Sequence, residues 1–204
     1  MPNWCDNRVL LKHDDPKMLR RAQTAYRRRS FAQAFLPMPT GYLKDQKWFH
    51  WRAYHWGTKQ DFGEGDYGRP PAIRDDGIEL RFDTAWGPPL PVYLELIRLG
   101  YGVDAAYYEP NTGCCGRINN RSYKAVGIDC WKPKCIRRHV DAHLVKTFSI
   151  DANSHSYRSK CTHGRKSWCE TNDLEIKITM LRLEEHRIQG VLDAVKAVRK
   201  SLAD

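Results

Sequence analysis

The chain has 204 residues, 41% of them hydrophobic and 11% aromatic, which is ordinary for a globular protein with one sizeable core or two small ones. Its formal net charge is +10, so nucleic acids, nucleotides and acidic proteins are the partners that its surface potential attracts. No apolar run approaches the ~18 residues of a membrane span and the N-terminus lacks the order of a signal peptide, so we expect a cytoplasmic protein without membrane contact.

The first part of the chain predicts a strand, a helix and a loop. Residues 3–12, "NWCDNRVLLK", alternate as a strand does. An acidic cap before Pro16 and apolar residues at helical spacing predict a helix from about residue 16 to residue 30. The prolines and glycine of "FLPMPTGY" predict a loop. Five aromatic side chains within residues 48–56 indicate that something large is packed or bound there.

The middle of the chain completes an alternating pattern of strands and helices. "FGEGDYGRPPAIRDDG" has the composition of a loop or hairpin, and "IELRFDTAW" alternates as a strand. "GPPLPVYLELIRLG" predicts a helix, and "YGVDAAYYEPNTGCCGRINNRSYKAVGI" predicts two strands. The resulting β-α-β-β-α-β order predicts an α+β, ferredoxin-like antiparallel sheet with helices on one face. We expect its core to combine five apolar side chains: Val9, Leu11, Phe82, Leu96 and Ile97.

The last third of the chain predicts an extension of this domain. "LEIKITML" alternates as a strand, and apolar residues at helical spacing from Ile188 to Leu202 predict a closing helix. We place a soft boundary near residue 128. It separates a ferredoxin-like domain at 1–127, with an inserted loop region at about 32–75, from a C-terminal strand and helix extension at 128–204.

Four ordered segments carry a resemblance to a known family: "MPNWCDN", "WGTKQDF", "FDTAWGPP" and "YYEPNTGCCG". Over roughly residues 1–126 they resemble the YubB-like ferredoxin-fold proteins of bacteriophages and plasmids, a group without an established activity. The chain departs from that family at Gln60, where a Trp is usual, and at Gly87, where a Ser is frequent. It also has Cys-Cys-Gly where an aromatic residue usually precedes Cys-Gly. The resemblance implies the fold and an origin in a mobile element.

Polar side chains beside large aromatics near strand ends predict a ligand pocket. A base would stack on Trp86 or Trp56, Lys59 would meet a phosphate, and Asp61 or Glu109 would accept from a ribose hydroxyl or a base N–H. The alternative for each residue is structural, with the indole rings in the core and Thr84 capping a helix. The candidate ligand-binding residues are Trp56, Lys59, Asp61, Thr84, Trp86 and Glu109.

Cysteines and histidines suggest a possible structural zinc. Seven cysteines cannot all pair within one chain, and cytosolic thiols are normally reduced, so we expect free thiols or metal ligands rather than disulfides. The spacing C-x4-C-x3-H-x3-H would put both histidines on one helix face, and its ligands would be Cys130, Cys135, His139 and His143. A second set could supply ligands instead: Cys161, His163 and Cys169.

A binding protein is favoured over an enzyme. Following the resemblance, we expect a phage- or plasmid-encoded accessory protein that counters host defence by binding an anionic nucleotide or a defence component. A protein that binds single-stranded nucleic acid is one alternative, although the usual aromatic RNA-recognition signature is missing. A metal-dependent hydrolase is the other, if the carboxylates of Asp61, Asp83 and Glu109 converge.

Overall fold

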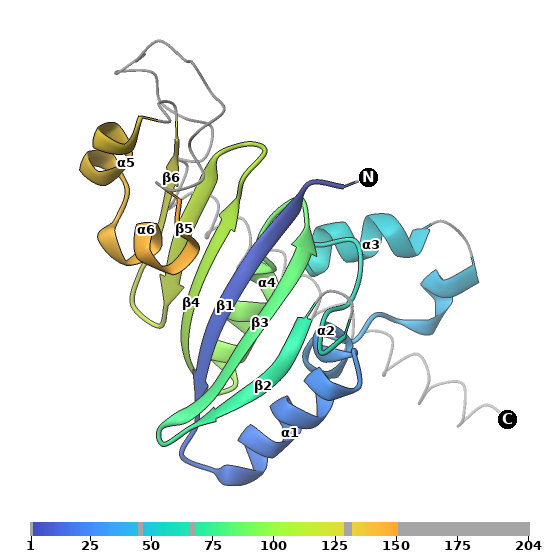
Figure 1. Cartoon of the computed structure of the whole chain (residues 1–204). Helices are drawn as coiled ribbons and strands as arrows, with labels where there is room; N and C mark the ends of the chain where they lie inside the picture. The colour runs from blue at the N-terminus through green and yellow to red at the C-terminus, as the bar shows by residue number, and fades with distance from the viewer. Residues whose placement is uncertain (1, 45–46, 66–67, 129–131, 151–204) are drawn as a thin grey trace, which may run out of the picture.

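One antiparallel sheet of six strands organises the chain, with helices on both of its faces (Figure 1). This computed structural model describes residues 2–44, 47–65, 68–128 and 132–150. The strand expected at 174–181, the closing helix, the second set of metal ligands and Cys130 lie outside the described residues.

The sheet has β1 at its centre, between β3 and β4. Its order is β2-β3-β1-β4-β5-β6, and every neighbouring pair is antiparallel. The strand expected at residues 3–12 is therefore confirmed as the central strand. The strands are β1 (Trp4–Lys12), β2 (Gly68–Arg74), β3 (Gly77–Ala85), β4 (Gly102–Glu109), β5 (Cys114–Asn119) and β6 (Tyr123–Gly127).

The first face of the sheet carries the main core. Val9, Leu11, Phe82 and Leu96 belong to one buried cluster and Ile97 packs against it, as expected. Alternate residues of β1 point into this cluster, because side chains on a strand alternate between its two faces. The helical segments that precede β4 are α1 (Pro16–Arg27), α2 (Phe31–Phe35), the 3-10 turn η1 (Thr40–Lys44), α3 (Lys47–His55) and α4 (Leu90–Arg98).

The second face is covered by two short helices, α5 (Pro133–His139) and α6 (Ala142–Phe148). They bury a separate apolar cluster against β4 and β5, in which Tyr108 and Cys115 lie beneath the helices. The expectation of helices on one face is therefore wrong. The physical reason is that β4 is apolar on both sides: Tyr107 belongs to the first cluster and Tyr108 to the second.

Two stretches contain more regular structure than their composition indicated. Residues 102–127 form three strands, because the chain turns back after both β4 and β5. The region expected as an inserted loop holds α2, η1, α3 and the edge strand β2. In β2, Pro70 and Pro71 lie where the pairing with β3 shifts register, between Arg69 and Ala72. Proline cannot donate to a sheet, and this composition gave no strand pattern.

The described cysteines differ in their state. Cys5 and Cys115 are buried thiols. Burial raises the pKa of Cys115 to about 12, which makes it a poor nucleophile at neutral pH. Cys114 is disulfide-bonded, so the expectation of reduced cysteines is wrong there. Among the described residues, no helix is long and apolar enough to cross a membrane.

Candidate functional site

The segment "HWGTKQDF" at residues 55–62 is anchored inside the protein. Trp56 is fully buried, and its Nε1–H donates to the carbonyl oxygen of Leu36 at 2.7 Å. The carboxylate of Asp61 accepts from the backbone N–H groups of Ala32 and Gln33 at 2.7 and 2.9 Å. These side chains hold α2 and the loop after it, which is a structural task.

Two further candidate residues satisfy buried polar groups. The hydroxyl of Thr84 donates to the Gly87 carbonyl at 2.7 Å and accepts from Nδ2 of Asn7 at 2.8 Å. The carboxylate of Glu109 accepts from the backbone N–H groups of Asn111 and Thr112, each at 2.8 Å. Both side chains are buried, and their contacts close turns at strand ends.

Lys59 and Trp86 lie closer to solvent, and the structure brings their two segments together. The Ala85 N–H donates to the hydroxyl of Thr58 at 3.0 Å, which joins the end of β3 to the loop after α3. Trp86 is 42% exposed and meets Phe49 of α3 edge to face, with ring centroids 5.6 Å apart. The Lys59 ammonium is 5.9 Å from the centroid of the same Phe49 ring.

The expected metal sites gain no support from the described residues. Within that part of the chain, no three His, Cys, Asp or Glu side chains are grouped to hold a metal ion, so Asp61, Asp83 and Glu109 do not converge. His139 ends α5 and His143 lies in α6, so they do not share one helix face. The zinc site stays a prediction, because it also includes Cys130.

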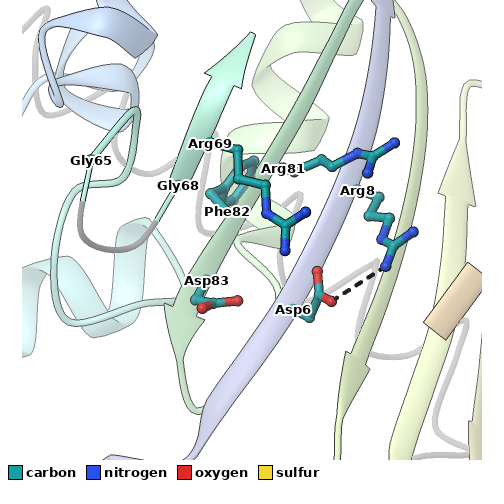
Figure 2. Close-up of a pocket in the computed structure, with 8 residues that line it drawn as sticks. All are labelled: Asp6, Arg8, Gly65, Gly68, Arg69, Arg81, Phe82 and Asp83. Carbon is teal, nitrogen blue, oxygen red and sulfur yellow. Dashed lines mark ion pairs between the residues drawn. The ribbon is translucent and has the colours of Figure 1, made fainter. Parts of the chain in front are cut away.

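A charged pocket opens on the second face, over β1, β2 and β3 (Figure 2). In Figure 1 this part of the face lies beside α5 and α6, and no described helix covers it. The pocket has a volume of about 270 Å³. Its lining residues are Asp6, Arg8, Gly65, Gly68, Arg69, Arg81, Phe82 and Asp83.

The strand register arranges the charges of this pocket in two rows. Arg81 of β3 lies opposite Arg8 of β1 and opposite Arg69 of β2, so three guanidinium groups come from adjacent strands. Asp6 and Asp83 lie opposite each other, two residues further along. Neighbouring strands are about 4.8 Å apart, and two residues span about 7 Å along a strand. Like charges directly opposite each other destabilise a sheet, so sheet stability does not explain these rows.

Two of the three arginines are held by neighbours. Nε of Arg81 donates to Glu79 at 2.6 Å. The Arg8 guanidinium lies 5.0 Å from the centroid of the Phe148 ring in α6, and its Nη2 is 3.9 Å from a carboxylate oxygen of Asp6. These contacts restrict both side chains before any ligand arrives.

Arg69, the third arginine, is less restricted by neighbours than Arg8 and Arg81. Its guanidinium makes no hydrogen bond to another described side chain, and Figure 2 shows it extending over the pocket toward the carboxylates. The backbone before it is fixed, because Gly65 and Gly68 form an antiparallel bridge. A Cβ on Gly68 would approach the Gly63 carbonyl oxygen to 1.9 Å, so only glycine fits there.

The pKa values of both carboxylates in the pocket are raised. Burial raises the pKa of Asp6, although the charges of Arg8, Arg69 and Arg81 act in the opposite direction. Burial also raises the pKa of Asp83, the charge of Asp6 raises it further, and Arg69 lowers it. Perturbed carboxylates in a concave site are typical of functional sites.

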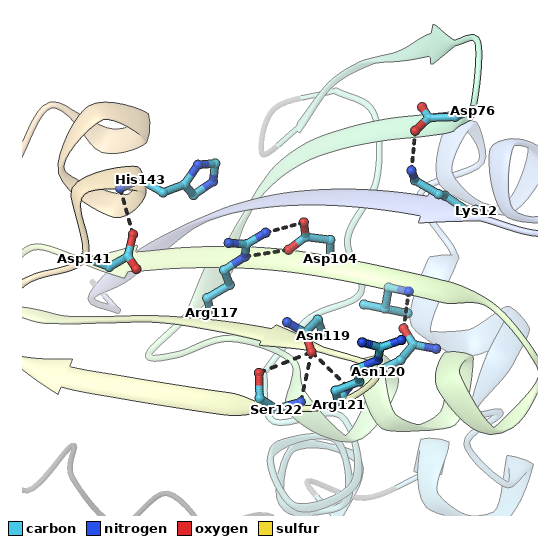
Figure 3. A network of polar contacts seen from close by, with 11 residues as sticks. Lys12, Asp76, Asp104, Arg117, Asn119, Asn120, Arg121, Ser122, Asp141 and His143 are labelled. Carbon is cyan, nitrogen blue, oxygen red and sulfur yellow. Dashed lines mark hydrogen bonds and ion pairs between the residues drawn. The ribbon is translucent and has the colours of Figure 1, made fainter.

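Two oppositely charged pairs lie elsewhere on the second face. Arg117 donates from Nε and Nη2 to the two carboxylate oxygens of Asp104, at 2.7 and 2.6 Å (Figure 3). Lys12 pairs with Asp76 near the end of β1. The pocket differs from these two pairs in having three arginines side by side.

Sequence reasoning missed this pocket, although part of its signal was present. "CDNRV" and "ELRFD" each place a carboxylate and an arginine two residues apart, opposite to the apolar positions, which is the pattern of one charged sheet face. No sequence pattern indicated the strand register that aligns the two rows. None indicated β2, the strand that carries Arg69. Comparison of the chain with protein-family models, curated proteins and solved structures finds no match.

Proposed function

We propose that the protein binds a phosphate-bearing anion of the nucleotide class in the charged pocket. The observation that carries this proposal is the row formed by Arg8, Arg69 and Arg81. A guanidinium group offers several N–H donors in a planar fork that matches phosphate oxygens. Because Phe148 and Glu79 already restrict two of these side chains, less freedom is lost when the anion binds.

The mixed charge of the pocket favours a small ligand over a nucleic-acid strand. Asp6 and Asp83 border the arginine row on one side, and Glu79 lies on the other. A groove that follows a nucleic-acid backbone needs a continuous positive surface. Single-stranded nucleic acid stays the alternative ligand. A metal-dependent hydrolase has less support, since the described carboxylates do not form a metal-binding group.

The wider biological proposal rests on the resemblance. The chain order β1-α1-β2-β3-α4-β4 has the β-α-β-β-α-β pattern of a ferredoxin-like unit, to which β5 and β6 are added. With the four family-like motifs, this order supports a phage or plasmid accessory protein that acts in the host cytoplasm. We propose that it sequesters an anionic nucleotide signal, or binds a defence component, without catalysing a reaction. A structural zinc would be found by elemental analysis of the purified protein.

Calorimetric titration tests the proposal. ATP, GTP, CTP, UTP and inorganic pyrophosphate are titrated at low salt into wild type, Arg69→Ala and Arg20→Ala. Arg20 is an exposed arginine of α1, so its replacement makes the same charge change outside the pocket. A charge-assisted hydrogen bond contributes about 1.5–3 kcal/mol, so Arg69→Ala should weaken binding about tenfold or more. Added salt should weaken binding further.

Two results would contradict the proposal. One is a wild-type protein that binds none of the five compounds. The other is an equal loss of affinity in Arg20→Ala and Arg69→Ala, which would assign the effect to net charge. Thermal melting of each variant checks that it is folded.

A further inference from the structure

We infer that the ligand of the charged pocket is a ribonucleotide, with its ribose hydroxyls on Asp6 and Asp83. This inference rests on the proposed function and specifies its ligand. It follows from the order of side chains along two strands and from the chemistry of a carboxylate.

The order of groups along β3 is guanidinium, then carboxylate. Arg81 and Asp83 are two residues apart on one face, about 7 Å along the strand. The neighbouring strand repeats the first two groups, since Arg8 lies opposite Arg81 and Asp6 opposite Asp83. Figure 2 shows the two carboxylates at one end of the pocket and the arginines at the other. Phosphate and ribose follow in the same order in a nucleotide.

The carboxylates restrict which group can lie at their end. An ionised carboxylate only accepts hydrogen bonds, so it cannot bind the oxygens of a phosphate, which are acceptors as well. The ligand group beside Asp6 and Asp83 must therefore carry donors. A ribose offers two neighbouring hydroxyls to two carboxylates that lie opposite each other on adjacent strands.

The test compares sugars that differ by single hydroxyl groups. The ribonucleoside triphosphate with the highest affinity in the first titration is compared with its 2′-deoxy and 2′,3′-dideoxy forms and with pyrophosphate. Wild type should bind the ribose form about tenfold or more tightly than the dideoxy form. Asp83→Asn should remove most of this preference while its affinity for the dideoxy form stays the same or rises, because a negative charge beside the phosphate is lost.

The possible failures are separable. If Arg69→Ala weakens every compound while the ribose and dideoxy forms bind equally to wild type, the phosphate site stands and the ribose assignment is overturned. An unchanged ribose preference in both Asp83→Asn and Asp6→Asn also overturns it. If wild type binds neither nucleotides nor pyrophosphate, the proposed function fails and the inference fails with it. Cooperative melting of each variant ensures that a loss reflects the pocket.

Discussion

At the residue scale, the facing carboxylates of the charged pocket should cost stability at neutral pH. The pKa of Asp83 is raised by burial and by Asp6, so the folded protein holds this proton more strongly than the unfolded chain does. Stability then falls as pH rises through the folded-state pKa, and the cost disappears below the ordinary carboxyl pKa of about 4. Asp83→Asn should therefore raise the melting temperature at pH 7, with a difference that shrinks toward pH 3. Thermal melts across this range measure it.

Asp104→Asn is the matched control for this prediction. Asp104 lies on the same face but accepts two hydrogen bonds from Arg117, so its neutralisation removes a favourable pair. We expect no gain in melting temperature at pH 7 for this variant. A lower melting temperature for Asp83→Asn at pH 7 would contradict the assignment of strain to the facing carboxylates.

At the element scale, α2 depends on a residue far away in the sequence. This helix has five residues, and its N-cap residue Ser30 makes no side-chain capping bond. Asp61 supplies the missing acceptors by binding the N–H groups of Ala32 and Gln33. Asp61→Ala should lower the free energy of unfolding by about 1–3 kcal/mol, because it leaves the half-buried N–H of Ala32 without a partner. Urea denaturation measures the loss.

A local cap provides the comparison. Asp15 caps α1 from its own N-terminus by accepting from Lys17 N–H at 2.8 Å, at an exposed position. Asp15→Ala should cost about 0.5–2 kcal/mol, the usual range for a cap. If Asp61→Ala costs clearly less than Asp15→Ala, α2 is held by its apolar contacts and not by Asp61.

Elements with a clear period were predictable from the sequence, and those without one were not. The alternation of β1 and β3 and the helical spacing of α1 and α4 matched the structure because each element buries one face. β4 buries both faces, so its pattern did not show that a second layer of helices would cover it. α3 is aromatic almost all round, and β2 contains two prolines, so neither had a periodic pattern.

At the scale of the whole molecule, the candidate site too could be predicted from the sequence only in part. The sequence brought Trp86 and Lys59 to attention as aromatic and basic residues in segments that do lie together. It could not show that the carboxylates of Asp61 and Glu109 would already accept hydrogen bonds from backbone N–H groups. The rows of the charged pocket depend on register among three strands, one of them distant in sequence, and register is a property of the assembled sheet.

The prolines of β2 also bear on how the protein behaves at high concentration. β2 is an edge strand of the described sheet, and Ile73 on it is 73% exposed. A flat edge with free N–H groups and an apolar side chain invites another chain to pair with it and aggregate. Pro70 and Pro71 lack those donors and interrupt the register, which protects the edge.

Replacing both prolines by threonine should convert this protected edge into a self-complementary one. We expect the double variant to form larger species as its concentration rises, seen by light scattering after size-exclusion chromatography, while Ile73→Lys in the same background restores the wild-type profile. Identical profiles for wild type and the double variant would show that the edge is blocked in another way. The two residues that hid β2 from sequence reasoning are thus the ones that we expect to keep separate copies of the protein from polymerising through their sheets.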